Sequence, residues 1–449
     1  MSSRPNDVDA MVALVRAGQL GTFVERAHEL ESADLADVLS ILDEDERLTV
    51  VRALPTELSG EALIEMPDEA HAEDTLAALD PEQAAEIVEG LEDDDAADIL
   101  GELEPEEAER ILSVVEDRAD VDRLLRYDEE TAGGLMTTHL VAVLATDTAN
   151  AALDAIRRQA EEVEDFYQVF VTDTEGRLVG LLPLRSLVVS PPTRIVAEIM
   201  DSAEIRVAPE DDQEDVARLM SKYNLASVPV VDASGRLLGR VTFDDVIDVV
   251  EAETTEDILQ FGGTSADERL AAGWREAVRS RLPWLLINLI TAFAAASVIL
   301  AQRNKIAQLT ILAVVMPIIA GMGGNASTQA LAVTVRRLAL GLTPPTQFMR
   351  IIGKETLVGL TNGIVNGAVA GTLAALVSLW MHQDPMLGMV VFLAMTGNLL
   401  VAGFAGAFIP ILLERRGIDP AVASSIFVTT FTDICGFYLI LSLAGALLL

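Results

Sequence analysis

Asp433 is the one acidic residue in the apolar run Pro420–Leu449. It lies about fourteen residues into that run, beside Thr432 and one helical turn after Thr429 and Thr430. A carboxylate at the centre of a bilayer costs about 2.5–3.5 kcal/mol on insertion scales, so it usually faces a cavity, an ion or a partner. It either binds a cation that passes through the membrane or accepts hydrogen bonds from hydroxyl groups of a neighbouring helix. Because none of the long apolar runs contains Lys or Arg, a cation is the simplest partner.

Asn325 is a second polar residue within an apolar run, where it follows Pro317 and the glycine-rich segment Gly321–Gly324. Glycine and proline are the weakest helix formers, so we expect the chain to bend or unwind there. Unwound backbone at membrane depth is tolerated only where protein or a water-filled path satisfies its polar groups. Glycines alone indicate helix packing, but a polar Asn325 directly after them favours the lining of an ion path.

Five runs lack charge for long enough to cross a bilayer, which takes about 20 residues. They are Leu282–Gln302, Ile306–Val335, Thr356–Gln383, Pro385–Leu413 and Pro420–Leu449, the last interrupted only by Asp433. Nine basic residues flank these runs on one side of the predicted membrane, against two on the other side. By the positive-inside rule, the N-terminal part is cytoplasmic, and five spans place the C-terminus outside.

The charge of the chain is distributed very unevenly between its two parts. Of the net charge of −40 over 449 residues, residues 1–270 carry −45 and residues 271–449 carry +5. This composition is typical of a membrane protein with a large aqueous domain; it excludes a purely soluble enzyme and disfavours nucleic acid as a partner. Lysine occurs only three times, and we interpret the acidic excess as a sign of a halophilic source. The single Cys435 cannot form an intrachain disulfide.

Gly359, Gly363, Gly367 and Gly371 recur every four residues in the third apolar run. This spacing puts them on one helix face, where it permits another helix to approach closely. Together with the paired cytoplasmic domains below, it leads us to expect a homodimer with its pore on or near the two-fold axis. The expected partners are therefore a second copy of the chain and membrane lipid, and not nucleic acid.

A repeat with a period near twelve residues organises the N-terminal part. Each unit has an apolar residue, then Asp, Glu or Pro at a predicted helix start, then Ala with Ile or Leu at helical spacing. The units begin at Leu42-Asp43, Leu54-Pro55, Met66-Pro67, Leu79-Asp80, Leu91-Glu92 and Leu103-Glu104. Acids and proline in the first turn suit the N-cap and the helix dipole. We predict short stacked helices that form a small superhelix over about residues 1–130.

A second, longer repeat follows the first. Leu135-Met136 recurs as Ile199-Met200, and Gly176–Gly180 recurs as Gly235–Gly239, at spacings of 64 and 59 residues. Each copy is predicted to contain a helix, a strand, a turn, a second strand and a second helix. This arrangement and the stretch VPVVD…GRLLGRVTFDDV resemble a pair of cystathionine-β-synthase (CBS) domains. Such pairs form a pseudo-two-fold module that often dimerises.

The whole chain resembles the MgtE-type magnesium channels. MPIIAGMGGNASTQALAVTVRRLALG and DPAVASSIFVTTFTDICGF are similar to the pore segments of that family, and TFDDVIDVVEAETTEDI is similar to the start of its plug helix. The resemblance implies a multi-domain chain with an all-α superhelical N domain, an α/β CBS-domain pair, a connecting helix and an α-helical membrane domain of five spans. These parts would occupy residues 1–130, 131–250 (copies 131–195 and 196–250), 251–276 and 277–449.

The resemblance also implies a function, which is magnesium uptake across the cell membrane through a homodimeric pore rather than enzymatic catalysis. In this interpretation Asp433 of both subunits binds the permeating ion, Asp419 lies at the cytoplasmic mouth and Asn325 belongs to the pore. Cytosolic Mg²⁺ between the acidic domains and the plug helix would close the channel. The candidate sensor residues are Asp245, Glu253, Glu256, Asp257, Glu214, Asp215, Asp93, Asp94, Asp95 and Asp98. A sensor acid of the family falls at Asn224, which would weaken one cytosolic site.

Other interpretations remain open at this stage. Hard oxygen ligands serve several divalent ions, so transport of Mn²⁺ or Co²⁺ is one alternative. A CBS-regulated membrane sensor without transport is another, although it would need neither Asp433 nor an interrupted second span. Some CBS pairs bind adenine nucleotides such as ATP, but this chain has neither a G-x-G-x-x-G motif nor a P-loop. Glu57, Glu61, Glu65 and Glu69 are expected on outer faces of the superhelix, where they would serve solvation.

Overall fold

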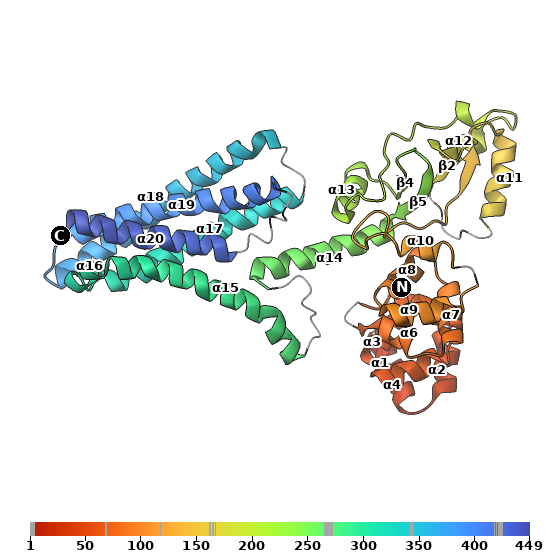
Figure 1. Cartoon of the computed structure of the whole chain (residues 1–449), viewed down its shortest axis with the longest axis horizontal. Coiled ribbons are helices and arrows are strands. Elements are labelled where there is room, and N and C mark those ends of the chain that lie inside the picture. The colour runs from red at the N-terminus through yellow and green to blue at the C-terminus, as the bar shows by residue number, and fades with distance from the viewer. Residues whose placement is uncertain are drawn as a thin grey trace. The chain divides into compact units, whose positions relative to one another are not determined.

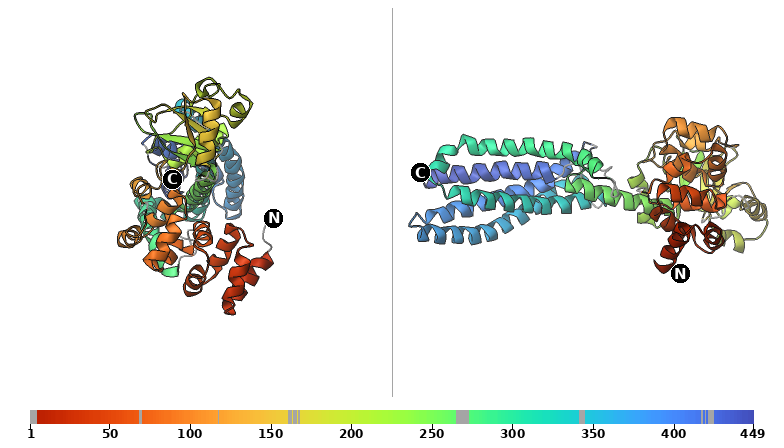
Figure 2. Two further views of the ribbon diagram at one scale, coloured as in Figure 1. Left: turned by 90° about the vertical axis from the view of Figure 1, so that its right-hand side faces the viewer. Right: turned by 90° about the horizontal axis from the view of Figure 1, so that it is seen from below.

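The computed structural model describes residues 5–67, 70–116, 118–160, 163, 166, 168–264, 273–340, 345–416, 418, 420 and 425–449. The chain divides into two compact units, Met1–Ala252 and Glu253–Leu449. The first unit contains many short helices followed by a strand-containing repeat, and the second is a bundle of long helices (Figures 1 and 2). The predicted fold class is therefore confirmed.

The first unit opens with a series of short helices. They are α1 (Pro5–Arg16), α2 (Leu20–Ala27), α3 (Ser32–Ile41), α4 (Glu44–Val51), α5 (Thr56–Ile64), α6 (Ala72–Ala77), α7 (Pro81–Glu89), α8 (Asp93–Gly101), α9 (Pro105–Leu112) and α10 (Val121–Leu124). Of the six predicted unit starts, five coincide with a helix start, and only α6 begins later. The short period of the repeat is therefore the period of the helices.

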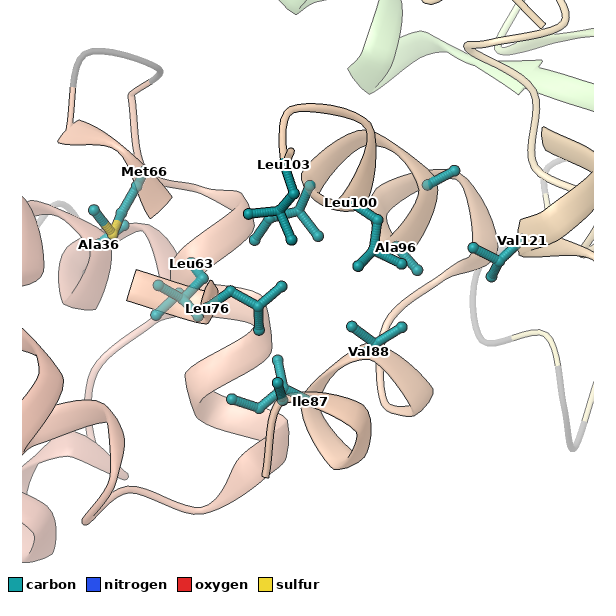
Figure 3. Close-up of a cluster of buried hydrophobic side chains, with 14 of the residues drawn as sticks. Ala36, Leu63, Met66, Leu76, Ile87, Val88, Ala96, Leu100, Leu103 and Val121 are labelled. Atoms are coloured by element: carbon teal, nitrogen blue, oxygen red, sulfur yellow. The ribbon is translucent and has the colours of Figure 1, made fainter. Parts of the chain in front are cut away.

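These helices stack in two alternating rows. The odd-numbered helices from α1 to α9 pack one on the next, and α4, α6, α8 and α10 form the second row. The core between the rows includes Leu63 of α5, Leu76 of α6, Ile87 of α7 and Leu100 of α8, each at most 2% exposed (Figure 3). Burial of about 1.5–3 kcal/mol per large apolar side chain stabilises helices too short to be stable alone.

Acids and prolines set the helix starts as predicted. At α4 the carboxylate of Asp43 accepts a hydrogen bond from the backbone N–H of Glu46 at 2.9 Å, and the Glu46 carboxylate accepts one from the N–H of Asp43 at 3.3 Å. This reciprocal pair satisfies two N–H groups that have no partner within the helix. α7 and α9 begin at Pro81 and Pro105, where the missing N–H group costs nothing.

The rest of the first unit contains the two copies of the longer repeat. The first copy has β1 (Ala142–Leu144), α11 (Ala149–Gln159), β2 (Val169–Thr172), β3 (Leu178–Leu182) and α12 (Leu184–Val189), and the second has α13 (Gln213–Tyr223), β4 (Ser227–Val231), β5 (Leu237–Thr242) and α14 (Phe243–Gly262), with the 3-10 helix η2 (Val196–Glu198) between them. β1 pairs parallel with β2, β2 pairs antiparallel with β3, and β4 pairs antiparallel with β5. The predicted order of elements is confirmed.

The two copies pair with each other through equivalent segments. The N–H of Leu178 donates to the carbonyl of Gly235 at 2.9 Å, and the N–H of Leu237 donates to the carbonyl of Gly176 at 3.0 Å. Gly176 and Gly235 have φ values of +79° and +82°, which glycine adopts without strain. The repeat spacing of the sequence therefore corresponds to a pseudo-two-fold pairing.

α14 runs without a break from the second repeat copy into the second unit. The connector expected at residues 251–276 consists of the second half of α14, the undescribed residues 265–272 and the start of α15 at Trp274. Near the end of α14, Phe261 packs against Leu331 and Val335 of α17, both within the second unit.

The second unit is a bundle of long helices. They are α15 (Trp274–Ala301), α17 (Leu312–Ala339), α18 (Phe348–Trp380), α19 (Met386–Glu414) and α20 (Ser425–Leu447), with the short helices α16 (Arg303–Gln308) and η3 (Pro345–Gln347). Among the described residues, four helices are long and apolar enough to cross a membrane, namely α15, α18, α19 and α20. α17 has 28 residues and packs against α19 and α20, but its glycines and polar residues make it less apolar. A fifth span at α17 stays a prediction.

The glycine ladder of α18 packs against α19 of the same chain. A Cβ atom on Gly359 would lie 2.3 Å from the carbonyl oxygen of Leu399, and one on Gly371 would lie 2.6 Å from that of Gly388. Close helix approach is therefore confirmed, and side chains larger than hydrogen would separate the two helices. Because the ladder is already occupied within one chain, it no longer supports a homodimer.

α17 corrects one expectation from the sequence. The helix continues through Pro317 and Gly321–Gly324, so the predicted unwinding is wrong, while a bend stays a prediction. The reason is packing, because Gly323 is buried where a Cβ atom would lie 2.2 Å from the side-chain nitrogen of Asn398 in α19. Tertiary contacts of this kind outweigh the low helix propensity of glycine, which is about 1 kcal/mol per residue.

Candidate functional site

Asp433 is a half-buried residue in the first half of α20. Among the described residues, its carboxylate makes no hydrogen bond or ion pair. The neighbouring hydroxyl groups bond to their own helix, since Thr430 donates to the carbonyl of Ile426 at 2.7 Å and Thr432 to that of Thr429 at 2.8 Å. The interpretation of Asp433 as an acceptor for hydroxyl groups of another helix therefore has no support here, and binding of a cation is favoured.

Asn325 of α17 lies in the same part of the bundle. A Cβ atom on Gly324 would lie 3.6 Å from the methyl group of Thr429, so this part of α17 faces the turn of α20 just before Asp433. Asn325 is exposed, and its side chain makes no hydrogen bond within the described part of the chain. An amide oxygen and a carboxylate are both oxygen ligands that suit a hard cation.

A second group of carboxylates lies in the first unit, where α8 meets the start of α14. α8 contributes Asp94, Asp95 and Asp98, and α14 contributes Asp245. Asp94 is 6% exposed, and its Oδ1 atom has no hydrogen-bond partner among the described residues. A buried carboxylate oxygen without a donor is costly unless a proton or a cation neutralises it. We refer to these four residues as the acidic cluster.

The carboxyl groups of the acidic cluster have raised pKa values. Burial, followed by repulsion from Asp245, raises the pKa of Asp95 to about 7. Loss of solvation, followed by repulsion from Asp95 and Asp245, raises the pKa of Asp98 to about 7, although Asp98 is exposed at the surface of the chain. Burial raises the pKa of Asp245 to about 6, partly offset by hydrogen bonds from Thr242. Burial and repulsion also raise the pKa of Asp94. A divalent cation would relieve this repulsion.

Asp93 has different surroundings although it belongs to the same helix. Its carboxylate accepts hydrogen bonds from the hydroxyl of Thr137 at 2.7 Å, the N–H of Thr138 at 3.1 Å and the hydroxyl of Thr138. Its oxygens are thus occupied by donors from the start of the first CBS copy. These bonds fix α8 against the CBS pair, so we leave Asp93 out of the ligand set proposed below.

Four further acids lie near the acidic cluster, although sequence reasoning did not single them out as sensors. They are Glu65, Glu92, Asp244 and Asp248. Burial and repulsion from Asp248 and Asp244 raise the pKa of Glu65, and burial raises the pKa of Glu92, partly offset by Arg240. Glu65 is exposed, as expected of an acid on an outer face, and repulsion from Asp244 and Asp248 at the start of α14 adds to the rise in its pKa. Glu65 is the residue after the last turn of α5, and Glu92 is the residue before the first turn of α8. The twelve-residue repeat could have indicated both positions.

Two of the predicted sensor acids are held by a neighbouring arginine. Glu214 and Asp215 lie on α13, where Arg218 approaches their carboxylates at 3.5 Å and 2.5 Å. The guanidinium of Arg218 already provides a positive charge for both carboxylates. The structure does not bring Glu214 and Asp215 into the acidic cluster. Asn224 ends α13 with φ of +53°, a left-handed conformation that asparagine tolerates.

Three further predicted sensor acids lie along α14. Glu253, Glu256 and Asp257 belong to the part of α14 within the second unit, and Glu256 accepts a hydrogen bond from Gln260. They share a helix with Asp245 of the acidic cluster. Asp419 lies outside the described residues.

His71, Glu73 and Asp74 form a compact set whose potential ligand atoms lie within 4.8 Å of one another. The Nδ1 atom of His71 is 2.9 Å from Glu73, and the guanidinium of Arg47 donates to the carbonyl of His71 at 3.4 Å. Glu73 and Asp74 attract this guanidinium. Because a positive charge is already built in, we assign no ion to this set.

Three regions of the chain match known protein families. Residues 30–130 match the MgtE intracellular N domain, residues 132–190 and 196–252 match CBS domains, and residues 316–443 match the divalent cation transporter family MgtE. The chain is 39% identical over 330 residues to the magnesium transporter MgtE of Enterococcus faecalis, which covers 74% of this chain and 72% of that protein. It is 38% identical over 335 residues to the protein of the same name from Thermus thermophilus, covering 74% and 73%.

A solved structure resembles the first unit. It is the crystal structure of the cytosolic domain of the Mg²⁺ channel MgtE in complex with ATP, with a TM-score of 0.50 and 38% identity. The match covers 53% of this chain and 99% of that one. The family matches, the two transporters and this structure agree with the order of parts found here, and the chain therefore belongs to the MgtE family of magnesium transporters.

Proposed function

We propose that this chain transports Mg²⁺ across the cell membrane along a path on which Asp433 binds the ion. The observation that carries the proposal is the Asp433 carboxylate, which lies in an apolar helix without a hydrogen bond or ion pair among the described residues. Exposed Asn325 on the adjacent α17 supplies a second oxygen in the same region. The family membership supports the same ion.

The chemistry of Mg²⁺ suits such a path. Mg²⁺ keeps near-ideal octahedral geometry and gives up its water reluctantly, so a site built from a carboxylate and an amide can hold it through its own water molecules. A carboxylate without a built-in cation also repels anions. Neither property requires the protein to supply six ligands, which agrees with the few polar residues present in α17 and α20.

We propose that the acidic cluster senses cytosolic Mg²⁺. Asp94, Asp95, Asp98 and Asp245 come from two different parts of the chain, and they repel one another when no cation is present. Glu65 and Glu92 would add to the negative field. A divalent cation binds more tightly to the arrangement that brings α8 and α14 together, and this difference in affinity shifts the population toward that arrangement.

α14 is the element that would transmit this shift. One end carries Asp245 of the acidic cluster, and the other end carries Phe261, which packs against residues of α17, α19 and α20. Glu253, Glu256 and Asp257 lie between these ends and would contribute further Mg²⁺ ligands. In this proposal a high cytosolic Mg²⁺ concentration holds α14 in the position that closes the path.

Flux measurements with purified full-length protein in liposomes test both proposals. External Mg²⁺ should enter the liposomes and be recorded by an internal Mg²⁺-sensitive dye. Where the cytoplasmic domains face the lumen, preloading the lumen with millimolar Mg²⁺ should slow further entry. An absence of Mg²⁺ flux would contradict the transport proposal. Flux that does not change with cytoplasmic Mg²⁺ would contradict the sensor proposal alone.

We further propose a homodimer in a lipid bilayer, with the N-terminus in the cytoplasm and the C-terminus outside. The excess of basic residues on one side of the spans supports the orientation. The pseudo-two-fold CBS pair supports the dimer. Mass measurement in mild detergent should give twice 48.1 kDa plus bound detergent. A monomer that transports Mg²⁺ would contradict the dimer.

Two extensions concern the ligands. Mn²⁺ and Co²⁺ accept similar oxygen ligands, and competition of each ion with Mg²⁺ flux tests a broader selectivity. The solved relative binds ATP in its cytosolic domain, and we propose the same class of ligand for the CBS pair here. Titration of the full-length protein with ATP should show saturable binding that is lost when competing unlabelled ATP is in excess.

A further inference from the structure

Asn398 is a polar residue in the middle of α19 that is 0% exposed. Its side-chain Nδ2 donates a hydrogen bond to the carbonyl of Ile319 in α17 at 3.0 Å. Its Oδ1 atom is also buried and has no hydrogen-bond partner among the described residues. Leucine has nearly the same shape and would leave no oxygen unpaired, so apolar packing alone does not account for an amide at this position.

Two glycines on different helices make room for this amide. A Cβ atom on Gly323 of α17 would lie 2.2 Å from Nδ2 of Asn398, and one on Gly436 of α20 would lie 2.9 Å from the same atom. Real Cβ atoms do not approach other atoms so closely, and the obstacle is a short side chain packed between helices. Asn398 therefore occupies the point where α17, α19 and α20 meet.

The same two glycines lie next to the residues assigned to the ion path. Gly323 is two residues before Asn325 in α17, and Gly436 is three residues after Asp433 in α20. Residues three apart share a face of a helix, so Asp433 and Gly436 neighbour each other on α20. The spacing between α17 and α20 at the level of Asp433 is thus set by what lies between Gly323 and Gly436, and that is the Asn398 amide.

We propose that Asn398 is a positioning residue for the ion path, and this inference rests on the proposed Mg²⁺ transport through Asp433. Its hydrogen bond to Ile319 fixes α17 relative to α19, and its contact with Gly436 fixes α20 relative to both. It does not bind the ion. It holds Asn325 and Asp433 at the separation that suits a hydrated divalent ion, so its loss should change affinity and selectivity more than the maximal rate.

Substitution by a residue of similar shape tests this role. Asn398→Leu keeps the volume and removes the hydrogen bond, and we expect it to raise the Mg²⁺ concentration for half-maximal flux by about 5- to 10-fold, with the maximal flux changed less than about 2-fold. The preference for Mg²⁺ over Mn²⁺ and Co²⁺ should fall.

A pair of glycine variants provides a check that does not depend on a single substitution. Gly323→Ala should nearly abolish flux because its Cβ atom meets the Asn398 amide. Asn398→Ala in the same chain removes that obstacle, so the double variant should recover flux relative to Gly323→Ala alone. Gly353→Ala, at a position on α18 with open space for a Cβ atom, is the control and should not respond to Asn398→Ala.

The outcomes separate this inference from the proposed function. Wild-type protein without Mg²⁺ flux, or full flux in Asp433→Asn, would overturn the proposed function. If both behave as expected but Asn398→Leu retains the wild-type half-saturation concentration and ion preference, Asn398 only fills space and the inference is overturned. The same conclusion follows if Gly323→Ala is not rescued by Asn398→Ala. Elution volume and unfolding temperature of each variant show whether it is folded.

Discussion

The carboxylates of the two units differ in number and in surroundings. Asp433 is a single acid in an apolar helix, and no described group pairs with it. The acidic cluster brings several acids together, and loss of solvation, followed by mutual repulsion, raises the pKa of Asp95 and Asp98 to about 7. A lone carboxylate attracts an ion weakly enough to release it, whereas a crowded set gains much from a bound ion. The first arrangement suits conduction and the second suits sensing.

Neutralising Asp433 should give the largest effect. Asp433→Asn removes the attraction between a carboxylate and the ion. This attraction is about 4 kcal/mol for a unit charge at 4 Å in an effective dielectric of 20, and it is larger for a divalent ion. We expect Mg²⁺ flux to fall by at least about 100-fold while the protein still inserts and elutes as the wild type does. Glu414→Gln, an exposed acid at the end of α19, is the matched control and should conduct normally. Equal flux in the two variants would remove Asp433 from the path.

Neutralising the acidic cluster should affect closure and not conduction. Asp95→Asn, Asp98→Asn and Asp245→Asn combined should raise the cytoplasmic Mg²⁺ concentration for half-closure by about 10-fold or more, within the usual range of coupling free energies. The maximal flux at low cytoplasmic Mg²⁺ should stay within about 2-fold of the wild type.

The control for this triple variant replaces three first-turn acids elsewhere in the superhelix, Glu57, Glu82 and Glu106, with glutamine. Ordinary surface changes are worth about 0.5 kcal/mol or less. Both proteins must be compared at the same high KCl concentration, because low salt alone strengthens repulsion. If the two triple variants close at the same Mg²⁺ concentration, the acids of the cluster serve solvation and the sensor proposal fails.

Asp93 should behave as a structural residue beside its ligand neighbours. Asp93→Ala leaves the hydroxyl of buried Thr137 and the N–H of Thr138 without their acceptor, which costs about 1–3 kcal/mol. We expect faster proteolysis between α10 and β1 in the absence of Mg²⁺. Asp95→Asn should not accelerate this cleavage. An Asp93→Ala protein as resistant as the wild type without Mg²⁺ would instead return Asp93 to the set of candidate ligands.

The smallest effect concerns pH. The pKa of Asp95 and Asp98 is about 7 in the folded chain, against about 3.9 for an unfolded aspartate. Folding therefore takes up protons, so without divalent ions the first unit should lose stability as pH rises from about 4 to about 7. Proteolysis of the full-length protein in EDTA should be a few-fold faster at pH 8 than at pH 6. Saturating Mg²⁺ replaces the protons and should reduce this difference, as should Asp95→Asn with Asp98→Asn.

Local signals in the sequence predicted the fold well. The twelve-residue repeat located most helix starts because acids and prolines act within one turn of a helix. The spacing of Gly176 and Gly235 predicted a paired module, since positive φ values at these positions are a local requirement. A single sequence could not show which helix packs against a given helix face. The ladder at Gly359 predicted close packing correctly, but the packed helix lies in the same chain.

The candidate site shows the same limit. Asp433 could be singled out from its charge and its apolar surroundings alone. The neighbours of an acid depend on tertiary contacts, so the sequence did not predict that exposed Glu65 would lie near the charges of Asp244 and Asp248. Asp215 was assigned to sensing, although Arg218 three residues later was a visible i, i+3 partner. The glycines of α17 predicted a bend or unwinding. The helix does not unwind, and its Gly323 accommodates the buried amide of Asn398, which lies far away in the sequence.

The alternating rows of the superhelix impose a parity on its length. Successive helices belong to opposite rows, so α8 stacks with α6 and α10 while α7 stacks with α5 and α9. Removing one twelve-residue unit would move every later helix to the other row and turn the acids of α8 away from α14. Removing two consecutive units would restore the rows and shorten the stack. Length changes in this domain should therefore be tolerated in steps of two units, and a lineage that lost one helix would have to lose its neighbour as well.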